Sequence, residues 1–306
     1  MAALRACNHG VLFVTVFWDS VGFGLVTASI IALASVAFSL QFSVTTTPNF
    51  AHGDLLTAGA YGALAAQFAT HNLAIEILAS LCVGGAVASI LNSALVQPFL
   101  RLGSRRITIF LVTVCFGWIL QNLLLIIYGG QPNVFVLPTF QLEQVGPFLW
   151  TTLDMAIMGT TVVVLLLLHV MLRYTKFGKA LRAVSDNPEL ARVTGIPYPR
   201  VVRLTWLIDG MLAGFAGFVL AAYIGSVTPT TGFSFLVVIF AASVIGGLGR
   251  PYGTAVGALI IGLAMEISAS YLPAEYKTAV AFVLLILALL VRPRGIFNTE
   301  IWNFAD

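Results

Sequence analysis

The chain has 306 residues, of which 59% are hydrophobic and only 9% are charged. A soluble globular domain carries roughly 25% charged residues, so the composition excludes a soluble fold and indicates a membrane protein. The formal net charge of +3 is explained by membrane topology and does not indicate nucleic-acid binding. The cysteines, Cys7, Cys82 and Cys115, lack the spacing of a disulfide framework or a metal site.

Long uncharged segments predict an all-α fold, a polytopic membrane helix bundle. Residues 20–53, 107–142, 155–172 and 210–249 contain no Asp, Glu, Lys or Arg, and one crossing needs roughly 20 apolar residues. We expect a single transmembrane domain over residues 1–306 with about eight or nine transmembrane segments. They lie near residues 20–42, 54–70, 73–97, 107–128, 151–172, 203–224, 234–249, 253–271 and 277–291.

The basic residues predict which ends of these segments face the cytoplasm. Twelve of the 15 Lys and Arg residues fall at 101–106, 173–203 and 292–294, which the positive-inside rule assigns to the cytoplasm. Residues 129–150 contain none and are the expected external loop, ordered but non-helical. Strict alternation puts the N-terminus outside. A broken helix or re-entrant pair within 20–53 would reverse this, so both orientations stay open.

Small residues recur at the spacing that lets membrane helices approach closely. They are Gly84 and Gly85 with Ser89, Gly210 with Gly214 and Gly217, and Gly253 with Gly257. In lipid no hydrophobic effect drives helix association, and such faces let the backbones pack against each other. We interpret these glycines as packing residues rather than functional ones.

A short polar helix is predicted inside the basic segment at about 173–203. Asp186 or Asn187 can cap the first backbone N–H groups, and Pro188 fits the first helical position. Glu189 complements the positive end of the helix dipole, and Gly195 can take the left-handed conformation that ends the helix. A helix of about two turns is unstable alone in water. It therefore rests on the membrane surface or docks on a partner, and we favour the partner.

Polar residues inside apolar segments are candidates for the translocation pathway, because ionisable groups there are costly and often functional. The candidates are Asn49, His52, Asp54, Asn122, Asp209 and Glu266. Asn49 can cap a helix whose first turn carries His52 and Asp54. For His52 and Asp54, stabilising a helix break is an equally good interpretation. For Asp209, Glu266 and Asn122, hydrogen bonding between helices is the favoured one.

Two segments resemble patterns of one transporter family. Residues 185–196 look like the EAA-type loop of ABC importer permeases, with Glu189, Ala191 and Gly195 at the matching places. Residues 49–54, Asn-Phe-Ala-His-Gly-Asp, resemble the signature of LivH-like branched-chain amino acid permeases. The similarity continues through residues 246–249, 253–258 and 292–297. The residues expected to couple this chain to an ATPase are Asp186, Asn187, Pro188, Glu189, Leu190, Ala191, Arg192 and Gly195.

The resemblance implies a multi-pass permease subunit in a bacterial inner (plasma) membrane. The implied partners are a LivM-like second permease subunit, two ABC ATPase subunits and a periplasmic substrate-binding protein, with membrane lipid around them. This chain would be no enzyme and would need no cofactor, and ATP and Mg²⁺ would bind the ATPase subunits. In agreement, the sequence has no G-x-x-x-x-G-K-[ST] nucleotide loop.

The implied cargo is a branched-chain or other neutral amino acid, and urea or short amides stay open, as does the choice between a homodimer and a heterodimer of permeases. An ion-coupled secondary transporter also uses intramembrane carboxylates, although it does not need a capped cytoplasmic helix. An intramembrane enzyme is disfavoured, because the chain has neither a G-x-S-x-G nor an H-E-x-x-H pattern.

Overall fold

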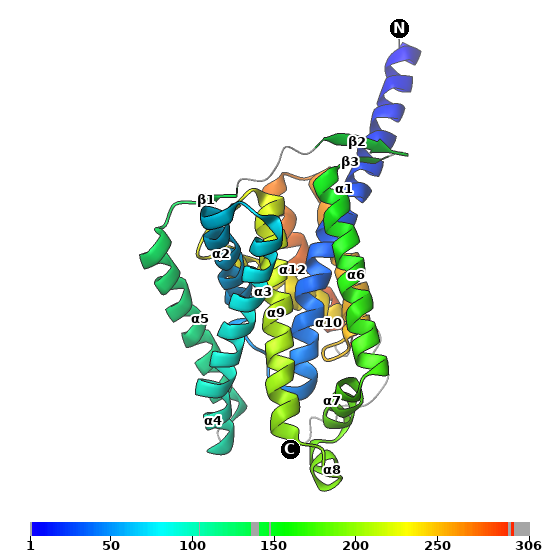
Figure 1. Cartoon of the computed structure of the whole chain (residues 1–306). Helices are drawn as coiled ribbons and strands as arrows, with labels where there is room; N and C mark the ends of the chain where they lie inside the picture. Colours follow the sequence, from blue (N-terminus) through cyan, green and yellow to red (C-terminus); the bar gives the residue numbers. More distant parts are fainter. Residues whose placement is uncertain (1, 104, 136–140, 147, 293–294, 297–306) are drawn as a thin grey trace.

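The computed structural model describes residues 2–103, 105–135, 141–146, 148–292 and 295–296. These residues form an upright bundle of long helices with short elements at both ends (Figure 1). The long helices are α1 (Ala2–Thr45), α2 (His52–Thr70), α3 (Leu73–Ile90), α5 (Arg106–Tyr128), α6 (Thr152–Tyr174), α9 (Tyr198–Ile224), α10 (Thr231–Gly246), α11 (Pro251–Ala269) and α12 (Lys277–Val291). A π-helical turn (Leu91–Val96) and α4 (Gln97–Arg101) extend α3.

Helices form at all nine predicted positions, which confirms the helical bundle. Among the described residues, six helices are long and apolar enough to cross a membrane by length and composition. The helices α10 and α12 are shorter apolar helices, and most of α2 is buried inside the bundle. The number of crossings therefore remains a prediction.

The first uncharged segment contains one interruption of the helix, at residues 46–51. Helix α1 continues to Thr45, a turn follows, and α2 begins at His52. In Figure 1 the start of α1 lies at the end of the bundle that carries β2 and β3, and α4, α7 and α8 lie at the opposite end. Since those three elements lie in the basic segments, the start of α1 lies at the end opposite the basic residues, which is the arrangement that strict alternation predicts.

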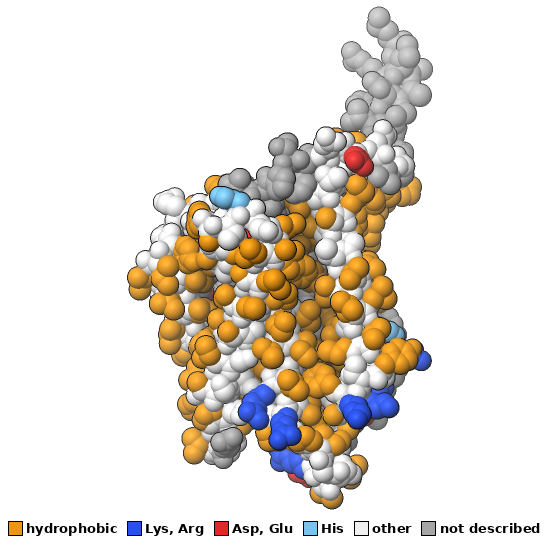
Figure 2. Space-filling model, viewed as in Figure 1, with side chains coloured by type: hydrophobic (Ala, Val, Ile, Leu, Met, Phe, Trp, Pro, Cys, Tyr) orange, Lys and Arg blue, Asp and Glu red, His pale blue; other side chains and the backbone are white. Residues whose placement is uncertain are grey.

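Apolar and basic side chains separate along the bundle. Figure 2 shows apolar side chains over the middle of the visible face, and Lys and Arg gathered at the lower end. The outward side chains of α5 and α6 are mostly apolar and exposed, for example Ile126 and Leu167. This is the distribution of a membrane protein with one basic end, which the positive-inside rule predicts to be cytoplasmic.

Helix α9 is the centre of the packing and contacts α1, α2 and α3. Its glycines bring the backbones together. A Cβ added at Gly84 would overlap the carbonyl oxygen of Gly210, and one added at Gly59 or Gly217 would overlap the backbone of Gly214 or Leu56. The prediction that these glycines serve packing is confirmed for the α3–α9 contact, and it extends to α2.

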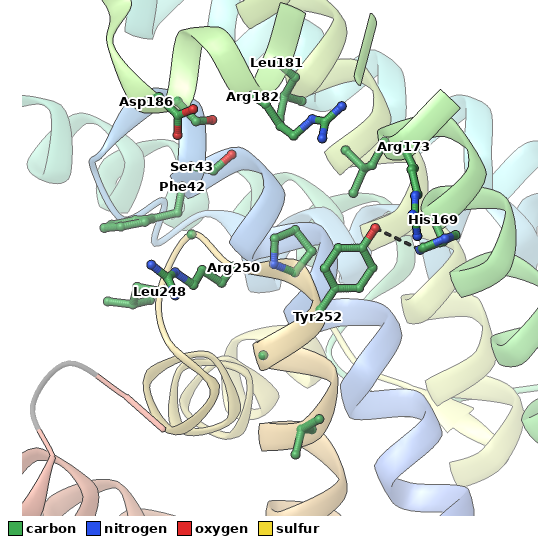
Figure 3. A pocket seen from close by; sticks show the side chains of 16 residues that line it. Phe42, Ser43, His169, Arg173, Leu181, Arg182, Asp186, Leu248, Arg250 and Tyr252 are labelled. Carbon is green, nitrogen blue, oxygen red and sulfur yellow. Dashed lines mark hydrogen bonds between the residues drawn. The ribbon is translucent and has the colours of Figure 1, made fainter. Parts of the chain in front are cut away.

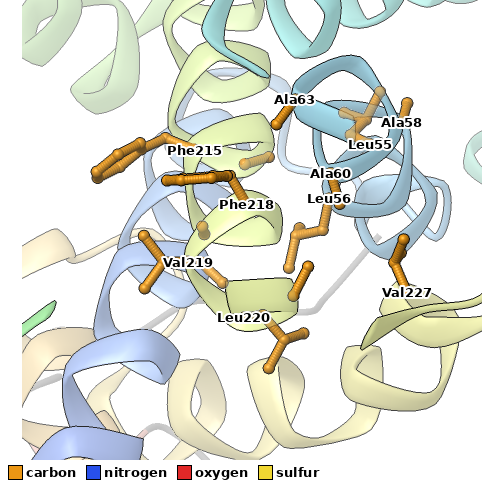
Figure 4. Packing of buried hydrophobic residues seen from close by; sticks show 14 of the residues in the cluster. Leu55, Leu56, Ala58, Ala60, Ala63, Phe215, Phe218, Val219, Leu220 and Val227 are labelled. Atoms are coloured by element: carbon orange, nitrogen blue, oxygen red, sulfur yellow. The ribbon is translucent and has the colours of Figure 1, made fainter. Parts of the chain in front are cut away.

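The same close approach recurs between α10 and α11. A Cβ at Gly257 would overlap the carbonyl oxygen of Ala242, and one at Gly246 would overlap that of Gly253. Around the α2–α9 contact the largest described apolar core forms, and Figure 4 shows Leu56 of α2 pointing toward Val219 and Leu220 of α9. The core therefore lies around α9, between α1 and α2.

The few strands lie at the end of the bundle opposite the basic residues, which the positive-inside rule predicts to be external. The pair β2 (Leu142–Val145) and β3 (Phe148–Thr151) forms a hairpin, and β1 (Asn133–Val134) pairs antiparallel with β4 (Ser226–Val227). The external loop predicted at 129–150 is thus ordered and non-helical where the structure describes it. Its residues 136–140 and 147 lie outside the described part of the chain.

Candidate functional site

The predicted polar helix is present as α8 (Pro188–Val193) at the basic end of the bundle. Asn187 is its N-cap, and the side-chain oxygen of Asn187 accepts hydrogen bonds from the backbone N–H groups of Glu189 (3.1 Å) and Leu190 (3.0 Å). Pro188 occupies the first helical position. Asp186 is instead the last residue of α7 (Lys176–Asp186). Of the two predicted caps, Asn187 is the one that is used.

The end of α8 is closed by a Schellman motif. Gly195 has a φ of +84°, its N–H donates to the carbonyl of Arg192 (3.1 Å), and the N–H of Ile196 donates to that of Ala191 (3.0 Å). Ala191 is buried, and Ile196 packs against the same apolar cluster. Gly195 therefore ends the helix as predicted, and the motif attaches α8 to the start of α9.

The outer face of α8 is apolar and free of other described residues. Leu190 is 60% exposed and Val193 is 85% exposed, the highest exposure of the large apolar side chains that the structure describes. The guanidinium of Arg192 lies over the ring of Tyr198, 4.3 Å from its centre, which adds a second contact between α8 and α9. Leu190 and Val193 therefore form a small exposed apolar surface on α8, and the contacts of α8 with α9 hold this surface in place.

Helix α7, which the sequence analysis did not identify, holds α8 on the bundle. Gly178, Leu181 and Val184 are buried on one face, whereas Lys179 and Arg182 lie on the exposed face. Spacing of apolar residues by three is the signal of an amphipathic helix, and it was present in the sequence. The predicted coupling loop is therefore two helices, α7 and α8, joined at Asn187.

His52 and Asp209 form a pair in the core, between α1, α2 and α9. Their side chains are fully buried, and Nδ1 of His52 lies 3.3 Å from Oδ1 of Asp209. Nε2 of His52 donates to the carbonyl oxygen of Ala34 in α1 (3.0 Å). The pair joins three helices, which fits the interpretation that these groups stabilise the bundle.

Asn49 and Asp54 hold the turn before α2 and link it to α5. The N-cap of α2 is Ala51 rather than Asn49; Asn49 lies two residues earlier, where its side-chain oxygen accepts from the N–H of Ala51 (3.1 Å). Asp54 is buried and accepts from Nε2 of Gln121 (2.7 Å). A Cβ at Gly117 would overlap the Asp54 carboxylate, so this glycine gives the carboxylate its space.

Glu266 and Asn122 lie apart from these groups. Glu266 accepts from the hydroxyl of Thr27 (2.9 Å) and pairs with Lys277 (2.7 Å), which joins α11 to α1 and α12. Asn122 points out of the bundle, and its Nδ2 donates to the carbonyl of Trp118 (2.8 Å). Its neighbour Gln121, not Asn122, makes the contact with α2. Thus the six pathway candidates do not form one cluster.

No group of three or more metal-ligating side chains occurs within the described ranges. The site therefore consists of the exposed apolar face of α8, the contacts with α7 and α9 that hold it, and buried polar contacts that join helices. None of these arrangements brings together a nucleophile and a base or an open metal position. The geometry is that of a helix bundle with a short, capped helix, α8, exposed at its basic end.

Comparison with known proteins agrees with this geometry. Residues 20–289 match the family model described as "Branched-chain amino acid transport system / permease component". The high-affinity branched-chain amino acid transport system permease protein LivH of Salmonella typhimurium is 30% identical over 294 residues, covering 90% of this chain and 93% of that protein. A probable LivH of Methanocaldococcus jannaschii is 29% identical over 293 residues, covering 90% and 91%.

One solved structure shares the fold. The chain titled "PsaBC from Streptococcus pneumoniae in complex with Fab" is 15% identical, covers 90% of this chain and 92% of its own, and superposes with a TM-score of 0.50. The helical bundle, the apolar spans and the match of residues 20–289 to the family model agree. This multi-pass membrane protein therefore belongs to the permease component family of branched-chain amino acid transport systems.

Proposed function

We propose that this chain is one permease subunit of an ATP-driven ABC importer of branched-chain or other neutral amino acids. Its family and the names of its relatives support the cargo class. The partners would be a second, LivM-like permease subunit, two ATPase subunits that bind ATP and Mg²⁺, and a periplasmic binding protein. The observation that carries the proposal is α8, a capped helix that exposes Leu190 and Val193 at the basic end.

In this proposal α8 enters a groove of an ATPase subunit. Leu190 and Val193 supply the apolar contact, and Glu189 and Arg192 flank it with charge. Asn187 and Gly195 fix the two ends of the helix. A displacement of α8 by the ATPase subunit would therefore move the whole helix instead of unwinding its ends. Because Ala191 and Ile196 pack α8 against the start of α9, a displacement of α8 is transmitted into the centre of the bundle.

The translocation pathway in this proposal runs between the two permease subunits, along the outer face of α5. There a shallow hollow of about 520 Å³ is lined by Asn122 together with apolar side chains such as Trp118 and Ile126. Asn122 would offer its amide to a passing substrate. Asn49, His52, Asp54, Asp209 and Glu266 would support the pathway indirectly, by holding the helices in place.

The test is uptake and ATP hydrolysis by the assembled importer in liposomes, with binding protein loaded with leucine. Val193→Asp places a charge on the exposed apolar surface of α8. It should abolish both uptake and the ATP hydrolysis that loaded binding protein stimulates. The matched control is Leu102→Asp at the same end of the bundle, where Leu102 is also highly exposed, at 79%. This control should transport normally.

Normal uptake by Val193→Asp would refute docking through α8. An energy-source experiment separates the proposal from an ion-coupled carrier. Depleting internal ATP while the ion gradient is held should stop an ABC importer, whereas dissipating the gradient at constant ATP should not. Uptake that follows the gradient would make the ion-coupled carrier the correct function.

A further inference from the structure

A cavity of about 980 Å³ lies at the cytoplasmic end of the bundle, beside α7 (Figure 3). Its walls come from the last turns of α6, the second half of α7, the end of α1, the turn at residues 248–250 and the first turns of α11. From α1, Phe42 contributes an apolar side chain to the lining and Ser43 contributes a hydroxyl group. None of the coupling or pathway candidates except Asp186 lines it.

The cavity is lined by more positive than negative side chains. Three arginines line it, Arg173 from α6, Arg182 from α7 and Arg250 from the turn before α11, against the single carboxylate of Asp186. Figure 3 shows these side chains arranged around the same space. Guanidinium groups bind phosphate through paired N–H donors. The lining therefore suits a phosphate-bearing ligand.

Two further features favour an anion. The cavity lies at the N-terminus of α11, a helix of 19 residues that begins at Pro251, and a helix N-terminus attracts negative charge. Ser185 also lines the cavity, and its buried hydroxyl has no hydrogen-bond partner among the residues that the structure describes. This hydroxyl is a spare donor for a bound oxygen.

The surroundings of the cavity favour a lipid. Val256 lines the cavity, and Leu259 and Ile260 continue from it along the exposed side of α11. Val170 and Leu166 do the same on α6. The hydroxyl of Tyr252 and Nδ1 of His169, 3.0 Å apart, bridge the two helices at the cavity. An apolar surface for acyl chains thus meets a cationic site for a headgroup at the expected depth of the cytoplasmic interface.

We propose that this cavity binds the phosphate headgroup of an anionic phospholipid of the cytoplasmic leaflet, with the acyl chains lying along α6 and α11. The proposal concerns a site separate from substrate transport, and it does not depend on the identity of the cargo. The lipid would join α7, and through it the docking helix α8, to α6 and α11.

The first experiment measures lipid retention by native mass spectrometry of the delipidated full chain, titrated with phosphatidylglycerol or phosphatidylcholine. Phosphatidylglycerol should bind at least tenfold more tightly. The double variant Arg173→Gln/Arg182→Gln should remove this preference, and the control Arg105→Gln, an exposed arginine outside the cavity, should keep it. Equal binding of both lipids, or an unchanged preference in the double variant, would overturn the proposal.

The second experiment uses the unmodified chain and so does not depend on how the variants fold. Phosphatidylglycerol with a photoreactive acyl chain should crosslink to the peptides of α6 and α11 that contain Val170 and Val256. Millimolar inorganic phosphate should leave the crosslinking unchanged. Displacement by phosphate would show a site for free anions instead, and crosslinks confined to other helices would place the lipid elsewhere; both results contradict the proposal.

Discussion

Replacing Asn187 by alanine should fray α8 without disturbing the bundle. The substitution removes the hydrogen bonds to the N–H groups of Glu189 and Leu190. Loss of an N-cap costs about 1 kcal/mol, which is roughly a fivefold change in an equilibrium constant. Because α8 has only six residues, the lost cap weakens its whole length. The population of frayed α8 should therefore rise about fivefold.

Limited trypsin digestion measures this fraying directly, since Arg192 lies in α8 and is exposed. When opening is fast relative to cleavage, the cleavage rate follows the open population. Cleavage after Arg192 should therefore become about fivefold faster in Asn187→Ala, whereas Asn187→Asp, which keeps a capping oxygen, should cleave at close to the original rate. Equal rates for the original and the alanine variant, or an aspartate variant as labile as alanine, would refute the capping argument.

Three further predictions concern the stability of the bundle, measured by thermal unfolding in detergent. Gly214→Ala should destabilise by about 1–3 kcal/mol through overlap at the helix crossing, whereas Gly159→Ala, with open space around it, should gain up to about 1 kcal/mol. Thr46 has a φ of +52°, so Thr46→Gly should stabilise by about 1 kcal/mol. Glu266→Gln and Lys277→Met should each lower the free energy of unfolding. The double variant should lower it by about 0.5–1 kcal/mol less than the sum of the two single effects, because each single change already removes the same partly exposed ion pair.

The results that would contradict these three predictions are specific. Equal effects of alanine at the two glycines would show that backbone contact does not limit the crossing. A less stable glycine variant at position 46 would show that the backbone there is not strained. Strict additivity at Glu266 and Lys277 would show that their contact contributes nothing.

Features that depend on local chemistry could be predicted from the sequence. The start and end of α8 follow from Asn187, Pro188 and Gly195, whose effects act within one turn of the chain. The apolar segments likewise gave the positions of the long helices, because a membrane crossing is set mainly by length and hydropathy. Helix α7 was readable in the same way but was missed, since its basic residues were assigned to a loop.

Contacts between distant residues could not be predicted. Nothing in the sequence indicates that His52 lies beside Asp209, which is on another helix, or that Gln121 rather than Asn122 reaches Asp54. Helix α5 is apolar around most of its circumference, so its sequence does not show which side faces the bundle. The direction of these two amides depends on how α5 rests on α2, which is a property of the packed fold.

The glycine crossings at α9 have a mechanical consequence. Where Gly59 and Gly84 meet Gly214 and Gly210, backbone lies directly on backbone, and no layer of side chains remains that could change rotamer and let the helices slide. Shear between packed helices depends on such small adjustments. In the proposed importer, a force applied at α8 would therefore turn α2, α3 and α9 together, as one rigid unit. The movement that alternating access would need in that importer would then occur at the edges of this unit, namely the turns at its ends and its contact with the second permease subunit.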